Sequence, residues 1–217
     1  MKELLMNFIY FINNPSYFKK ERTTSINVIY SFLFFLFSSY LFSLVIYFIF
    51  RYLNLNFKSG ILEIFKNDLL KVVIIAPFLE EFLFRAILKP NKLYLSFFLF
   101  ATSLFSFNLF SFNTYVVIFL SFFISISFFF SKIEMNYKKY NNNYKKLVYG
   151  SSILFGLVHL TNYDVTLHLL LFYLILTLPK IYLGFSLAFI RVKFGLIYAI
   201  LFHSLHNALP FLLKYFF

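Results

Sequence analysis

Long apolar runs alternate along this chain with short polar and basic stretches. The first run, residues 26–50, contains no charged residue. It exceeds the length of about 20 residues that a helix needs to cross a lipid bilayer. Six further runs of similar character follow, so the pattern predicts an all-α bundle of about seven transmembrane helices. The later predicted spans are residues 69–88, 93–111, 115–131, 147–162, 165–190 and 194–213.

The spacing of these runs divides the chain into three parts. Residues 1–25 are expected to form an interfacial segment, because two Asn and one Pro interrupt its apolar residues at positions 13–15. Residues 26–68 hold the first span and the loop after it, and residues 69–214 hold the other spans. No internal repeat is evident.

Two connections between the predicted spans are strongly basic. Residues 132–146, rich in Lys, Tyr and Asn, are expected to form the main loop outside the membrane. Residues 191–193 are expected to form a tight basic turn. Most loop Lys and Arg residues fall on one side of the bilayer if the N-terminus is cytoplasmic, which predicts a C-terminus outside the cell.

The composition supports a membrane location. Of the 217 residues, 61% are hydrophobic and 13% are charged, whereas soluble domains carry about 25% charged residues. The net charge of +12 arises mainly in short loops, where it favours contact with anionic lipid headgroups over nucleic acid. Cysteine is absent, which excludes disulfides and thiolate ligands. The abundance of Phe, Ile, Asn, Lys and Tyr suggests an AT-rich, bacterial genome.

Three charged residues, Glu80, Glu81 and Arg85, lie deep inside the second predicted span, where each charge costs about 2.5–3.5 kcal/mol. Glu81 and Arg85 are four residues apart and share a helix face, so they can neutralise each other. Glu80 points about 100° away from that face. It therefore needs a partner on another helix, or it must be protonated.

Other polar residues fall within apolar spans at a similar depth. Counted from the cytoplasmic ends, Glu80 lies about 12 Å deep, His159 about 18 Å and His203 about 13–14 Å. Asn207 shares a helix face with His203. The remaining polar outliers are His206, which lies near that face, His168, which we interpret as structural, and Asn108.

A carboxylate, two imidazoles and an amide at one depth suit the activation of water. Glu80 could accept a proton from water, while His and Asn side chains could stabilise an oxyanion. The same residues could instead bind a divalent metal such as zinc. A third possibility is that the polar groups only join helices to one another.

Three short motifs give the chain a resemblance to a known family. Residues 80–85, Glu-Glu-Phe-Leu-Phe-Arg, match EExxxR; residues 155–159 match FxxxH; and residues 203–207 match HxxxN. In this order the chain resembles the CAAX prenyl protease and bacteriocin-processing (CPBP) family, also called the Abi family, of intramembrane proteases. One departure is Ala86, where many members carry Gly.

The resemblance implies an intramembrane endopeptidase and a role for each motif. Glu80 would activate water with His159, His203 and Asn207 would form the oxyanion hole, and Glu81 with Arg85 would hold the helix in place. It implies a glutamate mechanism without a cofactor, although the family was first taken for metalloproteases and zinc remains possible.

The resemblance also leaves the partner and the activity open. The substrate would be a peptide, such as a bacteriocin leader, or a membrane protein, cleaved in or near the bilayer. A non-enzymatic immunity or transporter-associated protein is the alternative. An enzyme requires a cavity around Glu80, His159 and His203, whereas a non-enzymatic bundle would join them by dry contacts.

Overall fold

The computed structural model describes residues 2–16, 24–53, 69–89, 91–109, 124, 137–163 and 169–216. All regular elements in these residues are helical, as the sequence pattern predicts. The longer helices are α1 (Lys2–Asn13), α2 (Ser25–Tyr52), α4 (Ala76–Arg85), α5 (Lys92–Leu109), α8 (Tyr144–Val158), α9 (Leu170–Lys193) and α10 (Leu196–Phe216). The short ones are the π-helix η1 (Lys71–Ile75), the 3₁₀ helices η2 (Ala86–Leu88) and η3 (His159–Asn162), and α7 (Tyr137–Asn142).

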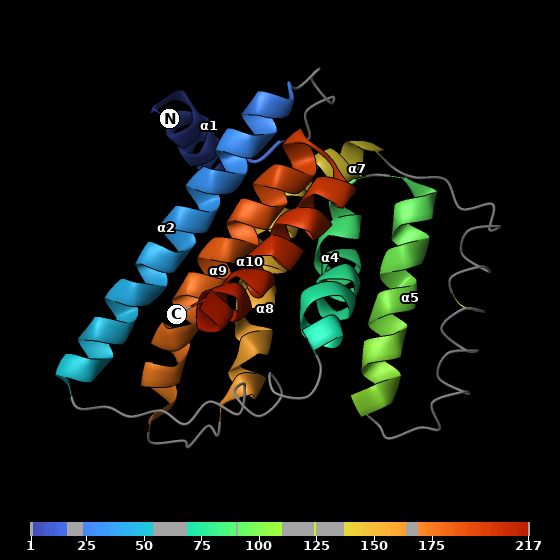
Figure 1. Ribbon diagram of the computed structural model, residues 1–217. Helices are drawn as coiled ribbons and strands as arrows, with labels where there is room; N and C mark the ends of the chain where they lie inside the picture. The colour runs from blue at the N-terminus through green and yellow to red at the C-terminus, as the bar shows by residue number, and fades with distance from the viewer. Residues whose placement is uncertain are drawn as a thin grey trace.

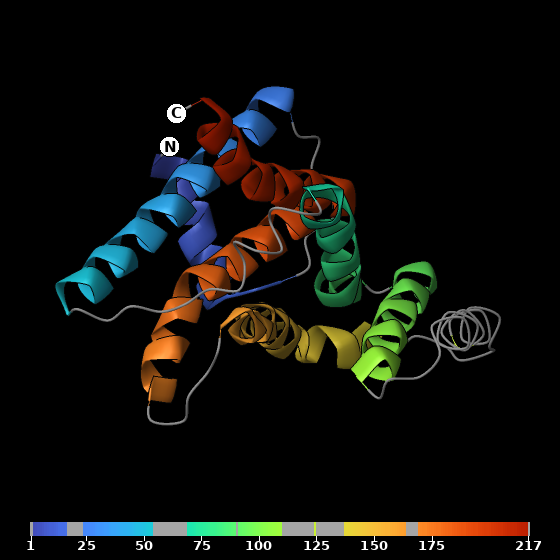
Figure 2. The same cartoon turned by 60° about the horizontal axis from the view of Figure 1, so that its bottom comes forward.

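Helix α9 lies at the centre of the bundle. It packs against α8, α10 and α2, and it also contacts α1 and α4. Helix α5 packs on α4 at the edge of the described bundle (Figure 1). The view turned by 60° shows α2 and α8 on different sides of α9 (Figure 2). Every helix that carries a candidate motif therefore contacts α9 or a direct neighbour of α9.

Helix α2 is buried along one narrow stripe and exposed elsewhere. The stripe includes Ser31, Phe35 and Ser39 and faces α9, where the Ser38 and Tyr182 hydroxyls lie 2.7 Å apart. The rest of the surface carries large apolar side chains such as Phe37, which is 71% exposed. An apolar helix face of this size without a protein partner is typical of lipid contact.

Two described helices, α2 and α9, are long and apolar enough to cross a membrane, and residues 196–212 form a shorter apolar helix. The residues of the first predicted span, 26–50, are helical and belong to α2. Helix α9 begins at Leu170, within the predicted span 165–190. Residues 115–131 lie outside the described residues apart from position 124, so the number of seven spans stays a prediction.

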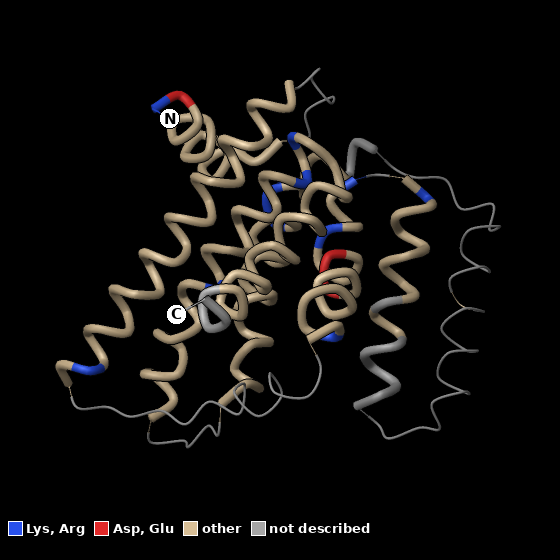
Figure 3. The backbone as a smooth tube through the Cα atoms, viewed as in Figure 1, with Lys and Arg blue, Asp and Glu red and all other residues tan. Residues whose placement is uncertain are grey.

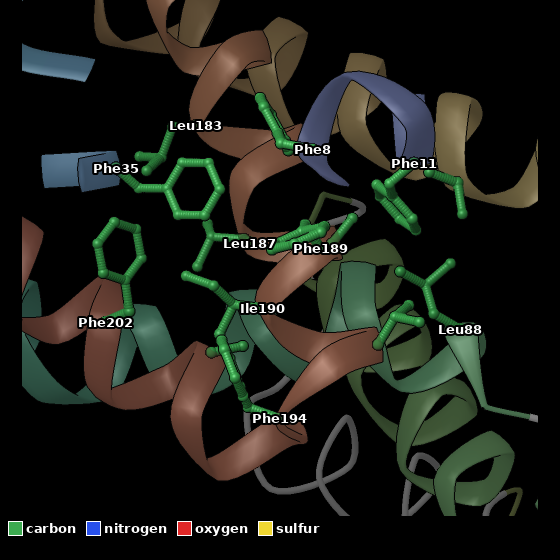
Figure 4. Packing of buried hydrophobic residues seen from close by; sticks show 14 of the residues in the cluster. Phe8, Phe11, Phe35, Leu88, Leu183, Leu187, Phe189, Ile190, Phe194 and Phe202 are labelled. Carbon is green, nitrogen blue, oxygen red and sulfur yellow. The ribbon is translucent and has the colours of Figure 1, made fainter. Parts of the chain in front are cut away.

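The core is made largely of aromatic rings from α1, α2, α9 and α10. Phe8 packs edge-on against Phe35 and Phe189, with ring centroids 4.8 and 5.6 Å apart. The packing around these rings is drawn in Figure 4. Such pairs add to the stabilisation that apolar burial gives. The predicted interfacial segment thus docks on the bundle through Phe8 and Phe11.

The predicted tight basic turn at residues 191–193 is wrong. Helix α9 continues to Lys193, and the chain turns at Gly195, whose φ of 118° favours glycine. Arg191 is buried, because its guanidinium lies over the Tyr94 ring at 4.3 Å and its Nε donates to the Arg85 carbonyl at 3.1 Å. The turn therefore lies at Phe194 and Gly195, after the basic residues.

The predicted loop 132–146 is also partly wrong, because residues 137–142 are helical and α8 begins at Tyr144. The Tyr140 and Tyr144 hydroxyls donate to the carbonyls of Ile87 and Leu88, at 2.8 and 3.2 Å. These tyrosines attach the segment to the end of η2, which an apolar-versus-polar pattern does not reveal.

Two glycines let α8 and α9 approach closely. A Cβ added to Gly184 would lie 2.7 Å from the Ser152 carbonyl oxygen, and one added to Gly156 would lie 2.8 Å from the Ile181 nitrogen. Small residues at helix contacts are a common means of close packing in membranes. This contact fixes the register between the two helices.

The Gly184→Ala substitution should therefore destabilise the protein, by about 1–3 kcal/mol as for other overpacked contacts. The matched control is Gly150→Ala on α8, where an added Cβ meets nothing within 4 Å. Thermal unfolding of the purified proteins in detergent would measure both. Equal melting temperatures for the two variants would contradict the close approach.

Candidate functional site

Helix α4 carries three charged residues of the EExxxR motif into the interior of the bundle. The π-helix η1 leads directly into α4, and Pro77 lies just after the junction. Because Pro77 has no N–H, it cannot donate to a carbonyl of η1. Figure 3 shows the acidic residues of α4 within the bundle, while Lys and Arg are more frequent toward its upper end in that view. The three charged side chains of α4 therefore need partners inside the bundle.

Glu81 is fully buried and has two cationic or polar neighbours. Its Oε1 lies 3.0 Å from Nδ1 of His203, and its Oε2 lies 3.7 Å from Nε of Arg85. The sequence-based pairing of Glu81 with Arg85 is thus present. His203 is an additional partner that brings α10 into the same cluster.

Arg85 is buried together with Glu81 and reaches α8. Its Nη1 donates to the Ser151 carbonyl at 3.5 Å, and its guanidinium lies 4.8 Å from the Phe155 ring centroid. A cation over an aromatic face is favourable, particularly where water is excluded. Arg85 therefore ties α4 to the helix that carries FxxxH.

Glu80 finds the interhelical neighbour that its isolation in α4 requires. Its Oε2 lies 3.8 Å from Nε2 of His203, so the His203 ring stands between two carboxylates. The ring also packs edge-on against Phe155, with centroids 5.5 Å apart. Unlike Glu81, the Glu80 side chain keeps 30% of its surface exposed.

That exposed part of Glu80 faces a cavity of about 320 Å³. Two of the lining residues, Thr161 and Pro210, are themselves exposed, so the cavity reaches the protein surface. Its walls combine η1, α2 and α4 with the end of α8, η3, α9 and α10. The lining residues are Tyr40, Ser43, Val72, Ala76, Glu80, Val158, His159, Thr161, Asn162, Lys180, His206, Asn207 and Pro210.

His159 lies in the cavity wall where α8 gives way to η3. Its Nδ1 lies 2.8 Å from the carbonyl oxygen of Phe155. A carbonyl only accepts, so Nδ1 carries the hydrogen, and in the neutral ring Nε2 is left as an acceptor. The FxxxH motif thus fixes the tautomer of its histidine through its own first residue.

Asn207 lies in the wall opposite the end of α8. Its Nδ2 donates to the Val72 carbonyl at 3.1 Å, and Val72 belongs to η1. π-helical turns occur frequently at functional sites. An amide nitrogen carries two hydrogens, and this contact uses one of them.

The structure brings most of the candidate residues together. Glu80, His159 and Asn207 line one cavity, and His203 lies directly behind Glu80 without being a lining residue. His206 is also in the wall, stacked on Tyr40 with ring centroids 4.7 Å apart. His168 lies outside the described residues, and so does the side chain of Asn108.

No three His, Asp or Glu side chains of the described chain are grouped so that they could hold a metal ion. The zinc alternative thus gains no ligand set from these residues. A mechanism without metal stays a prediction.

Two features of the site were missed in the sequence. Lys180 is not among the site residues predicted from the sequence, although a lysine beside Pro179 in an apolar run is itself a signal. Tyr40 lines the cavity, and its hydroxyl donates to the His206 carbonyl. The sequence does not indicate this role, because a tyrosine is common in an aromatic-rich helix.

The comparison with known families identifies the chain. The sequence profile described as Type II CAAX prenyl endopeptidase Rce1-like matches residues 67–209, which is more than half of the chain. The protein therefore belongs to this family, and the resemblance to the CAAX protease group is confirmed. Comparisons with curated proteins and with solved structures gave no match.

Removing one member of the Glu81–Arg85 pair should destabilise the fold. Arg85→Met leaves the buried Glu81 with His203 alone, and losing one partner of a buried pair costs about 3–5 kcal/mol. Thermal unfolding should show a large loss for Arg85→Met and for Glu81→Gln, and a smaller loss for the double variant than for the sum of the two. Strict additivity would contradict their coupling.

Proposed function

We propose that the protein is a multi-pass intramembrane endopeptidase in which Glu80 activates a water molecule for attack on a peptide bond. The observation that carries this proposal is that Glu80 and His159, from different helices, line one cavity that reaches the protein surface. The family supports a CAAX-type protease. The residue roles are our own assignment.

The first step is proton transfer from water to the Glu80 carboxylate. The free Nε2 of His159 accepts a hydrogen bond from the same water and orients it. The hydroxide oxygen forms a bond to the carbonyl carbon of the substrate, and the C=O π electrons move to its oxygen. Glu80 then returns its proton to the leaving amine nitrogen as the C–N bond breaks.

Asn207 is suited to stabilise the oxyanion of that intermediate directly. Asn207 lines the cavity and has a second amide hydrogen beyond the one given to Val72. His203 lies behind Glu80 and outside the cavity lining, so the part we propose for it is to hold Glu80 in place through Nε2 while Glu81 holds its Nδ1. Preorganised donors of this kind contribute strongly to catalysis in sites that exclude water.

The arrangement also weighs against a bundle that only uses polar residues to join helices. Glu81, Arg85 and His203 do make the dry contacts expected of such a bundle. Glu80 and His159 instead face open space, which interhelical contacts do not require. We infer that the contacts among Glu81, Arg85 and His203 hold Glu80 and His159 in position. We also infer that the substrate is a peptide or membrane protein that enters from the bilayer.

Glu80→Gln should lower proteolysis by about 10²–10⁴-fold, the range for loss of a general base. Proteomics of membranes from wild-type and Glu80→Gln cells would identify a substrate, and cleavage of that substrate by the purified proteins would give the rates. Glu3→Gln on α1 is the control. Full activity of Glu80→Gln with an unchanged melting temperature would eliminate Glu80 as the base.

Activity should also persist without a bound transition metal. Elemental analysis of the purified protein and an assay after strong chelation would test this directly. Stoichiometric zinc, with chelator-sensitive activity that zinc restores, would replace the glutamate mechanism by a metal-dependent one. Glu80 and the histidines would then be candidate ligands.

A further inference from the structure

The backbone carbonyl of His206 lacks its usual partner within α10. In an α-helix each carbonyl accepts from the N–H four residues later, and the residue four positions after His206 is Pro210. Proline carries no N–H, so it cannot donate to that carbonyl. A carbonyl freed inside a membrane bundle needs a donor from a neighbour. Here the donor comes from another helix, because the Tyr40 hydroxyl of α2 donates to the His206 carbonyl.

A second proline frees a carbonyl where η1 meets α4. The N–H of Ala76 donates to the carbonyl of Lys71, five residues before it. In this pattern the next carbonyl, that of Val72, would be paired with an N–H of Pro77, which has none. The Val72 carbonyl instead accepts from Nδ2 of Asn207 at 3.1 Å. One proline thus provides the acceptor that holds the Asn207 side chain.

The two freed carbonyls act together on Asn207. The His206 carbonyl and the Asn207 nitrogen belong to one planar peptide group. Tyr40 therefore holds the backbone from which the Asn207 side chain extends, while Val72 holds the amide at its end. The Tyr40 ring is also stacked on the His206 ring, with centroids 4.7 Å apart and planes 12° apart. These contacts fix the direction in which Asn207 faces the cavity that it lines.

We propose that Tyr40 is a positioning residue that aligns the Asn207 amide with the oxyanion. This inference rests on the proposed endopeptidase function and adds a residue to its machinery. A donor that is aligned before the reaction does not have to reorganise during it. Tyr40 lies on α2, outside the residues 67–209 that match the family profile. The site is thus completed by a helix that precedes the matched region.

Helix α2 has other contacts that hold it on the bundle. Phe32 and Phe35 both pack on Phe202 of α10, with ring centroids 5.2 and 6.4 Å apart. The Tyr40 hydroxyl is therefore not needed to attach α2 to α10. Tyr40→Phe removes only this hydroxyl and keeps the ring that stacks on His206, so the variant should fold.

The contact can be measured without turnover, because His206–Asn207 is the only His–Asn pair in the sequence. Labelling with ¹³C at the His carbonyl and ¹⁵N at the Asn backbone gives one NMR correlation, which comes from this peptide group. The full chain is studied in lipid nanodiscs. Tyr40→Phe should move the His206 carbonyl signal upfield, because a hydrogen bond deshields the carbonyl carbon. Pro210→Ala restores an N–H at position 210 and should reverse this change in the Tyr40→Phe background.

The matched control is Tyr47→Phe on the same helix. The Tyr47 hydroxyl accepts from Arg51 at 3.1 Å and does not line the cavity, so its loss should leave the signal in place. An unchanged signal in Tyr40→Phe would overturn the contact. A displaced signal that Pro210→Ala does not reverse would overturn the part assigned to the proline.

The role in catalysis is tested by a double-mutant cycle with Asn207. The probe is a fluorogenic peptide that contains the cleavage site found by comparing wild-type and Glu80→Gln membranes. Tyr40→Phe should lower kcat about tenfold with little change in KM, because removing an oxyanion donor outright costs about 10²–10³-fold. In the Asn207→Ala background the same substitution should have no further effect. Tyr47→Phe should keep full activity.

Equal losses from Tyr40→Phe with and without Asn207 would overturn the positioning role, because a contact that only supports the fold acts independently of that amide. A change confined to KM, or a fully active Tyr40→Phe protein, would overturn it as well. Failure of the proposed function gives a different result, in which the unaltered chain shows no cleavage that depends on Glu80. The NMR signal then still decides whether Tyr40 holds the His206–Asn207 peptide.

Discussion

The buried carboxylate of Glu81 is the group on which the arrangement of the candidate site depends. A fully buried charge is tolerated only where partners surround it, and here those partners come from the same turn of α4 and from α10. His203 cannot satisfy Glu81 without also bringing its other nitrogen to Glu80. The position of the proposed base is therefore a consequence of a structural contact next to it.

The sequence predicted the type of fold well and its boundaries less well. An apolar run without charges, such as residues 26–50, carries its own signal, because length and composition suffice for a membrane helix. The ends of α9 and α8 depended on tertiary contacts instead. Arg191 remains helical because its guanidinium packs on Tyr94 and donates to the Arg85 carbonyl. Tyr144 begins a helix, and its hydroxyl donates to the Leu88 carbonyl. Such partners are distant in sequence and leave no local pattern.

Some candidate residues could be predicted because charged and polar side chains are easily recognised within apolar runs. Glu80, His159 and Asn207 stood out in apolar helices, and they line one cavity. Depth along a helix does not give rotation about its axis, which is why His203 was expected in the cavity and lies behind Glu80. The sequence shows Lys180 as a charged residue within an apolar run. Its position in the cavity wall depends on the glycine contact between α8 and α9.

The long sequence separation across the site has a consequence for biosynthesis. Glu81 and His203 are 122 positions apart, so α4 is made well before the helix that completes its cluster. During that interval Glu81 and Arg85 neutralise each other within one turn, while Glu80 has no counterpart. The newly made chain thus lacks the complete Glu80–His203–Glu81 cluster until then. Only when α10 has been made can His203 join Glu81 and Glu80, so the cluster behind the proposed base is completed late in synthesis.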